Sequence, residues 1–246
     1  MSGEARGNVV AAIAAVVALI VAVSVSMLVD TGSDGAAAQS TSPTAEPAPE
    51  EEPFPAITAV PVGHHGEYAV QYDDVPPETQ AQLDTVRAII ERYPTGADAM
   101  AAGYIPATVN LKGIASHYIK SGAIGFTTFD EAFDINEPEA LLYDGNEPDS
   151  PIVGISYLAS GVTAPEGFEG PWDVWHRHDA VCFAGGLVVA EVGGHEGSLI
   201  DITAQECAAQ NGITYPIDNL SMIHVWMKPG YPSETGVFAH DHSDLV

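Results

Sequence analysis

The feature that most constrains the fold is a series of short apolar segments separated by glycine, proline, asparagine and aspartate. Short segments with such turn-forming flanks are typical of β-strands. They cover residues 67–72, 115–119, 140–143, 152–158, 173–183, 186–192 and 222–228. A doubly wound α/β fold would need helices between these strands, and few helical segments are present. We therefore expect an α+β domain, mainly an antiparallel sheet or a small barrel with a few short helices.

Three segments have helical patterns, and one glycine pair indicates a turn. Residues 78–93 carry apolar side chains at helical spacing, and residues 97–102 predict a second, shorter helix. Thr203 and Glu206 have the spacing of a capping box, which predicts a third short helix that carries Cys207. Gly185-Gly186 lies between two strand-like segments and predicts a hairpin turn.

The N-terminal part of the chain has the pattern of a membrane anchor. Val9–Val29 contains no charged residue, and at about 1.5 Å per residue a helix of this length crosses a hydrocarbon core of about 30 Å. Arg6 precedes it and Asp30 follows, so the positive-inside rule places the remainder of the chain outside the cytoplasm. The alternative is a cleaved signal peptide, for which Ala36-Ala37-Ala38 offers small residues, and a secreted protein.

These observations divide the chain into three parts. Residues 1–30 are expected to form the transmembrane anchor or an uncleaved signal. Residues 31–55 are mostly Ala, Ser, Thr, Pro and Glu, a composition that predicts a disordered acidic linker. Residues 56–246 are expected to form one extracytoplasmic α+β domain. We therefore expect a single-pass protein of the cell membrane whose C-terminal domain lies outside.

The charge of the chain is strongly negative. The formal net charge is −27, with 34 Asp and Glu against 7 Lys and Arg. Such a chain repels nucleic acid, so we expect no nucleic-acid partner. Scattered acidity with three lysines resembles the composition of proteins from high-salt cells, and a cation-binding surface is the alternative interpretation. The sequence does not indicate which small molecule or protein the domain meets.

Cys182 and Cys207 are the only two cysteines. An even cysteine count outside the cytoplasm favours a disulfide bond, which would stabilise the fold by roughly 3 kcal/mol in the chain-entropy model. The alternative interpretation makes Cys182 a thiolate ligand of a metal ion. A redox-active thiol protein is disfavoured because no Cys-x-x-Cys pair is present.

Four histidines predict a metal site. If residues 173–183 form one strand, His176, His178 and Cys182 project from the same face. His224 lies between Ile223 and Val225. Because successive side chains of a strand point to opposite faces, Ile223 and Val225 share one apolar face and His224 projects from the other. His117 lies in a similar strand-like context. Neutral imidazoles suit Zn, Cu, Fe or Ni, and such binding weakens below their ordinary pKa of about 6.5.

The remaining polar motifs carry weaker signals. His64-His65 and His240-Asp241-His242 are expected at the surface. The chain contains no Gly-x-Ser-x-Gly elbow, phosphate-binding loop or dinucleotide fingerprint, so serine hydrolysis and nucleotide chemistry have no support.

The order of several short segments is similar to an uncharacterised secreted α+β domain family of bacteria and archaea. The segments are 102–104, 117–118, 138–143, 152–154, 175–178, 224–226 and 236–239. The likeness covers roughly residues 78–246. No activity is established for that family, so the resemblance implies a single secreted domain and directs attention to the same four histidines without supplying a substrate.

Two functional hypotheses follow. The first is a membrane-tethered extracytoplasmic domain with one transition-metal ion on His176, His178 and His224, and with His117 as fourth ligand or supporting donor. The second is a metal-free binding or structural module of the cell surface with buried, hydrogen-bonded histidines. A catalytic centre would need an open coordination position and a nearby acid or base, and the sequence identifies no catalytic residue.

Overall fold

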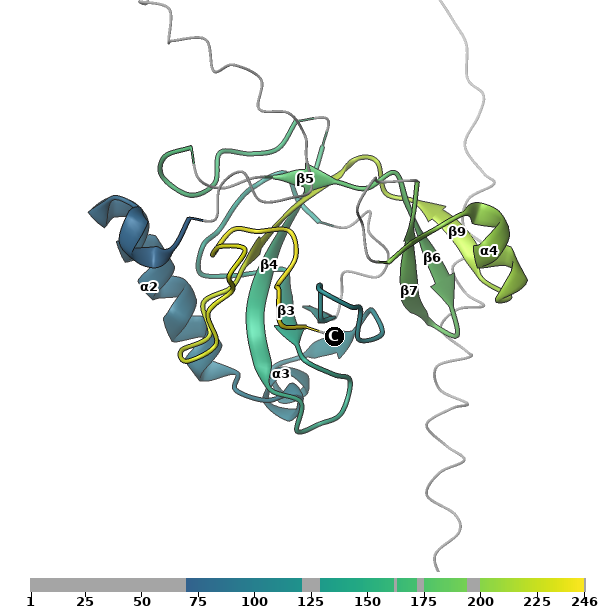
Figure 1. Cartoon of the computed structure of the whole chain (residues 1–246), viewed down its shortest axis with the longest axis horizontal. Helices are drawn as coiled ribbons and strands as arrows, with labels where there is room; N and C mark the ends of the chain where they lie inside the picture. The colour runs from purple at the N-terminus through teal and green to yellow at the C-terminus, as the bar shows by residue number, and fades with distance from the viewer. Residues whose placement is uncertain (1–69, 121–128, 162, 172–174, 194–199, 246) are drawn as a thin grey trace, which may run out of the picture. The chain divides into compact units, whose positions relative to one another are not determined.

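The structure is a computed structural model that describes residues 70–120, 129–161, 163–171, 175–193 and 200–245 (Figure 1). All of them belong to one compact unit, Ile57–Val246. The apolar segment Val9–Val29, the linker and residues 67–69 lie outside the described residues. Within the described part, no helix has the length and apolar character needed to span a bilayer.

The larger sheet has six strands in the order β1-β2-β3-β4-β10-β5, and neighbouring strands are antiparallel. The strands are β1 (Tyr104–Pro106), β2 (Ser116–Lys120), β3 (Ala140–Tyr143), β4 (Ile152–Ser160), β5 (His176–Arg177) and β10 (Leu220–Val225). The mainly antiparallel α+β architecture expected from the short apolar segments is therefore present.

The smaller sheet has four strands in the order β8-β7-β6-β9. They are β6 (Ala180–Ala184), β7 (Leu187–Val192), β8 (Asp201–Ile202) and β9 (Ile213–Pro216). The predicted hairpin at Gly185-Gly186 joins β6 to β7, and both glycines have positive φ. The pair β7 and β8 is parallel.

The helices begin and end close to the predicted positions. They are α2 (Pro77–Arg92), α3 (Gly96–Ala101) and α4 (Ala204–Ala209), with a short 3-10 helix η1 at Tyr72–Asp74. The capping box predicted for α4 is present, since the Thr203 side chain accepts from the Glu206 backbone N–H and Glu206 accepts from that of Thr203. The strand expected at residues 67–72 is wrong for its described part, because Tyr72 begins η1.

The two faces of the six-stranded sheet have different partners. On one face Ile223 and Val225 of β10 pack with Leu83 and Val86 of α2 in a single buried cluster. Alternation points His224 to the other face, as the sequence predicts. There Met222 and Leu158 form a second cluster with residues of the smaller sheet, including Val181 and Val188. Figure 1 accordingly shows α2 and the strands β6, β7 and β9 on opposite sides of β4.

The strand predicted over residues 173–183 is divided in two. His176 and Arg177 pair with β10 in the larger sheet, whereas Ala180 begins β6 in the smaller one. The Arg177 guanidinium holds the first part in place, since Nε donates to Ser221 Oγ (2.8 Å) and Nη2 donates to the Gly161 carbonyl (3.0 Å). The expectation that His176, His178 and Cys182 share one strand face is therefore wrong.

A disulfide bond joins Cys182 of β6 to Cys207 of α4. Both cysteines are fully buried, in a cluster with Ala180, Ala190 and Val192. Gly212 lies so close that an added Cβ would be 2.6 Å from Cys182 Sγ and 2.7 Å from Cys207 Sγ, which explains the glycine. The pairing excludes Cys182 as a thiolate ligand in this structure.

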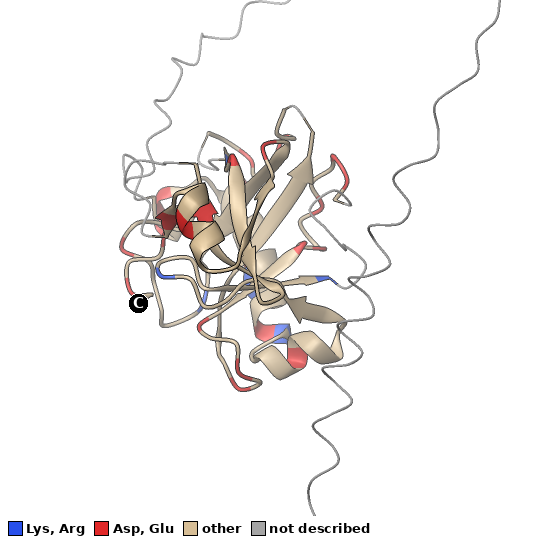
Figure 2. Cartoon of the chain, turned by 90° about the vertical axis from the view of Figure 1, so that its right-hand side faces the viewer, with Lys and Arg blue, Asp and Glu red and all other residues tan. Residues whose placement is uncertain are grey.

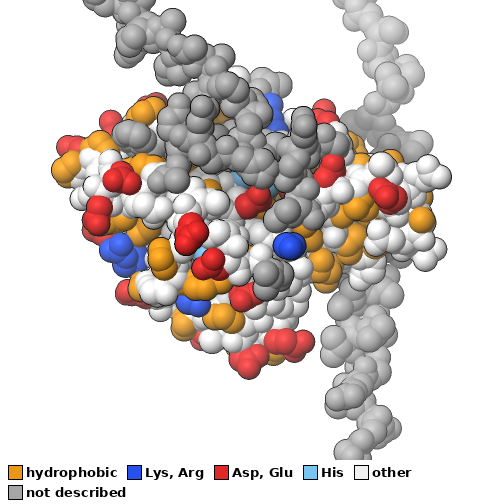
Figure 3. Space-filling model, viewed as in Figure 1, with side chains coloured by type: hydrophobic (Ala, Val, Ile, Leu, Met, Phe, Trp, Pro, Cys, Tyr) orange, Lys and Arg blue, Asp and Glu red, His pale blue; other side chains and the backbone are white. Residues whose placement is uncertain are grey.

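Acidic side chains are spread over the described surface instead of forming one patch. Figure 2 shows Asp and Glu on helices and on several loops, and Lys and Arg at few positions. In Figure 3 the acidic side chains of the viewed face alternate with hydrophobic and neutral ones. Such a distribution agrees with the general surface acidity expected from composition.

Candidate metal centre

The histidines singled out from the sequence lie in one cluster on the face of the larger sheet that meets the smaller sheet. Ring centroids are 5.3 Å apart for His117 and His224, 5.1 Å for His224 and His176, and 5.2 Å for His176 and His178. Each side chain is 9% exposed or less. His117 lies on β2, His176 on β5 and His224 on β10, and His178 follows directly after β5.

Two residues that the sequence analysis did not select complete the cluster. His240, expected at the surface, has a side chain only 8% exposed, and its ring centroid lies 4.5 Å from that of His176. Glu191 of β7 is 5% exposed. Glu191 is the one charged residue in the otherwise apolar strand Leu187–Val192. A carboxylate that is buried with such a strand needs a polar partner, so this position could have been recognised as a candidate from the sequence.

His176, His178 and His240 form the group best placed for a metal ion. One ring nitrogen from each lies within 4.8 Å of the others, which is close enough for the three to hold one ion. Imidazole nitrogens bind zinc at about 2.0–2.1 Å and also suit copper, iron and nickel.

One carboxylate orients the ring of His240, and a second carboxylate lies close to two of the three rings. Asp241 Oδ1 lies 2.6 Å from His240 Nδ1, so this nitrogen donates to the carboxylate and Nε2 faces the cluster. Glu191 Oε1 lies 3.4 Å from His178 Nδ1 and 3.8 Å from His240 Nε2. Glu191 is therefore within reach of two of the three rings, as a ligand or as an acceptor for their N–H groups.

His224 and His117 form a second pair beside this group. The His224 Nδ1 donates to the His240 carbonyl (2.8 Å), because a carbonyl only accepts. The neutral ring then has a bare Nε2, which lies 3.3 Å from His117 Nε2 and accepts its proton. The same separation is about that of two nitrogens bound to one tetrahedral ion at about 2.0–2.1 Å. In the two strands between them, Ser156 lies opposite His224 and Ala140 lies opposite Ser156, whereas Leu142 lies opposite His117.

Both rings are neutral near neutral pH. Burial, with a smaller contribution from the neighbouring His240, lowers the pKa of His117 to about 4. Burial, followed by the neighbouring His117, places the pKa of His224 well below its ordinary value. Neutral imidazole is the form that binds metal ions.

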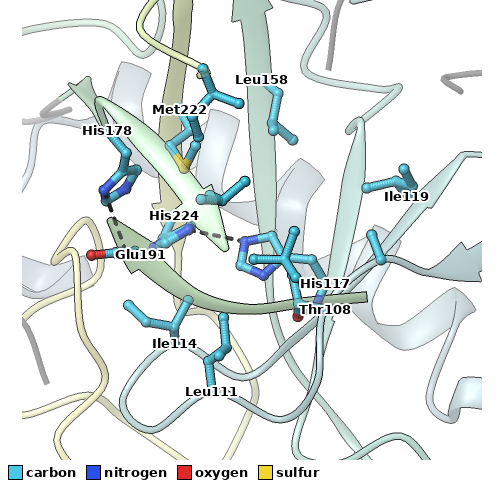
Figure 4. Close-up of a pocket in the computed structure, with 14 residues that line it drawn as sticks. Thr108, Leu111, Ile114, His117, Ile119, Leu158, His178, Glu191, Met222 and His224 are labelled. Atoms are coloured by element: carbon cyan, nitrogen blue, oxygen red, sulfur yellow. Dashed lines mark hydrogen bonds and ion pairs between the residues drawn. The ribbon is translucent and has the colours of Figure 1, made fainter. Parts of the chain in front are cut away.

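A cavity of about 50 Å³ adjoins the cluster (Figure 4). His117, His178, His224 and Glu191 are among its lining residues, and Figure 4 shows the rings of His117 and His224 facing each other there. Most of the other lining side chains are apolar.

His64-His65 lies outside the described residues. No family model, no curated protein and no solved structure matches the chain. The resemblance to a secreted domain family therefore stays a prediction, and the geometry of the histidines is the basis for a functional proposal.

Proposed function

We propose that this chain is a membrane-tethered extracytoplasmic metalloprotein whose domain binds one transition-metal ion through His176, His178 and His240. The observation that carries the proposal is that one ring nitrogen from each of the three residues lies within 4.8 Å of the others. Three imidazoles beside a carboxylate make a donor set that suits zinc, copper, iron or nickel. His240 thus joins His176 and His178 in place of His224 as the third ligand.

The remaining polar residues of the cluster have supporting roles in this proposal. Glu191 is the fourth donor, or orients His178 through its Nδ1. His224 donates to the backbone carbonyl of His240 and so holds that ligand in place. His117 donates to His224 in turn. Partners of this kind are known to raise metal affinity because they keep the ligand rings in the binding orientation.

The tether and the location are the part of the proposal that rests on sequence. The support is the long uncharged segment Val9–Val29, with Arg6 before it and Asp30 after it. The disulfide Cys182–Cys207 agrees with a domain outside the cytoplasm, where oxidising conditions maintain such bonds.

A metal-free structural or binding module is the second candidate. The observation that favours it is that several rings already have protein partners. His224 is bonded at both nitrogens, and His240 is paired with Asp241. In this case the cluster would contribute stability alone.

Elemental analysis of the purified full chain separates the two candidates. Single replacement of His176, His178 or His240 by Ala should lower the bound transition metal while the circular dichroism spectrum is kept. His242→Ala is the matched control, because His242 is also buried but stacks on Tyr231 outside the cluster. A wild-type chain that carries no transition metal and gains no thermal stability from Zn, Cu, Ni or Fe would refute the metal site.

A further inference from the structure

The cavity beside the histidines is small and mostly apolar. It lies between the larger sheet, which contributes Ile119, Leu158 and Met222, and the smaller sheet, which contributes Val181 and Val188. Leu111 and Ile114 cover it from the segment before β2, as Figure 4 shows. Its volume is about 50 Å³.

The polar groups in its wall, apart from Thr108, belong to the metal centre or support it. They are His117, His178, His224 and Glu191. Thr108, the remaining polar residue among the described lining, has its hydroxyl engaged, since it donates to the Val109 carbonyl (2.8 Å) and accepts from the His117 N–H (2.9 Å). A molecule in the cavity would therefore meet mostly apolar side chains, together with the histidines and Glu191 of the cluster.

The volume restricts the occupant to a few atoms. An apolar cavity of about 150 Å³ binds benzene or xenon, and pockets for larger organic ligands measure about 300–1,000 Å³. The present cavity is about a third of the first figure, which leaves room for two or three non-hydrogen atoms.

The character of the walls restricts the charge of the occupant. An ion that enters the apolar part of the cavity, away from the histidines and Glu191, loses its hydration without replacement, which is strongly unfavourable. A neutral, weakly hydrated molecule loses little on entry and gains dispersion contacts with the walls.

We infer that this cavity binds a small neutral gas molecule of the dioxygen class and presents it to the metal ion held by His176, His178 and His240. The class includes dioxygen, nitric oxide and carbon dioxide. The position of the cavity supports the inference, because His178 is both a proposed metal ligand and a lining residue. The presentation to a metal rests on the proposed function, whereas binding in the cavity does not.

Xenon is the probe that tests binding in the cavity without any metal. In methyl-labelled full chain in detergent micelles, xenon pressure should produce saturable chemical-shift changes at Ile114, Ile119 and Leu158. The methyl groups of Leu83 and Ile90, which belong to the cluster under α2, should not respond in this way. Wild-type protein without saturable changes at the cavity methyls would overturn the inference.

Filling the cavity provides a matched pair of variants. Ala107→Leu adds three carbon atoms to a lining residue that is not fully buried and should weaken xenon binding at least tenfold. Ala88→Leu makes the same change on the exposed side of α2 and should leave xenon binding unchanged. If Ala107→Leu does not fold, Ile119→Phe serves as the filling variant. Unchanged xenon binding in a folded filling variant would contradict the assignment.

Nitric oxide tests presentation to the metal. Full chain loaded anaerobically with ferrous iron, with iron content confirmed by elemental analysis, should give an iron–nitrosyl electron paramagnetic resonance signal. The filling variant should weaken the signal at equal iron content. Iron-loaded protein without the signal would overturn the presentation step. If the chain binds xenon but binds no transition metal, the proposed function is refuted, whereas the inference that the cavity binds a small neutral gas molecule still holds.

Discussion

His117 and His224 face each other with their Nε2 atoms 3.3 Å apart, although two strands separate them in the sheet. The fixed donor at His224 Nδ1 sets the direction of this hydrogen bond, from His117 to His224. Both rings are buried, so loss of either leaves a buried nitrogen of the other without its partner. Such a loss costs about 1–3 kcal/mol.

A double-mutant cycle tests this pairing. His117→Phe and His224→Phe should each lower the free energy of unfolding of the metal-free chain by about 1–3 kcal/mol. The double variant should lose less than the sum, with a coupling of about 1 kcal/mol, because neither nitrogen is then left behind. Urea unfolding measures the free energy of unfolding of the two single variants and of the double variant. The control cycle pairs His117→Phe with His242→Phe and should be additive. Additive losses in the first cycle would show that the two rings do not interact.

Glu191 should determine metal affinity more than stability. Glu191→Gln removes the carboxylate within reach of His178 and His240 while keeping the shape of the side chain. We expect the affinity for zinc to fall about 10- to 100-fold, as for other residues that bind or orient metal ligands. Competition with a chromophoric chelator measures it. Glu137→Gln, at an exposed carboxylate paired with Lys120, is the control and should leave the affinity unchanged. Equal affinities in both variants would exclude Glu191 from the site.

Glu139 should make the stability depend on pH. Burial raises its pKa to about 7, although the Leu158 N–H donates to it (3.0 Å). The folded state therefore holds a proton that the unfolded state releases, and stability falls as pH rises from about 4.5 to about 7. Glu139→Gln removes this loss. The variant should equal the wild type at pH 4.5 and exceed it at pH 8 by on the order of 2 kcal/mol, with the partial exposure of the side chain taken into account. A constant difference between the two unfolding curves across pH would refute the assignment.

Removal of the disulfide should destabilise the domain without releasing metal. Cys182 and Cys207 are 25 positions apart, and opening a loop of this size costs about 3 kcal/mol in the chain-entropy model. The variant in which both cysteines are replaced by Ser should show this loss in urea unfolding and keep its metal content. Non-reducing peptide mapping of the wild type should recover the two cysteines in one linked species. Free thiols in protein purified under air would contradict the bond.

The N-terminal segment should hold the protein in the membrane. Because Val9–Val29 is long and uncharged, the intact chain should remain with membranes after carbonate extraction. Protease added from outside should cleave the C-terminal domain in intact cells. A mature chain that begins near Gln39 would replace the anchor with a cleaved signal peptide.

The sequence by itself determined the features that depend on neighbours a few residues away. The helix Pro77–Arg92 follows from apolar residues at helical spacing, and the start of α4 follows from the capping box of Thr203 and Glu206. The hairpin at Gly185-Gly186 and the alternation around His224 are of the same kind. Local backbone geometry and side-chain periodicity are enough to specify them.

Only the tertiary structure decided which strands pair and which polar side chains meet. Residues 173–183 read as one strand, yet His176 pairs with β10 and Cys182 with β7 and β9, because the choice of partner depends on strands distant in sequence. His240 read as a surface residue, because it begins the polar run His240-Asp241-His242-Ser243-Asp244. Its burial comes from the packing of the C-terminal segment against β10, whose His224 donates to its carbonyl. Burial of a polar residue depends on contacts distant in sequence, so the place of His240 in the cluster could be determined only from the tertiary structure.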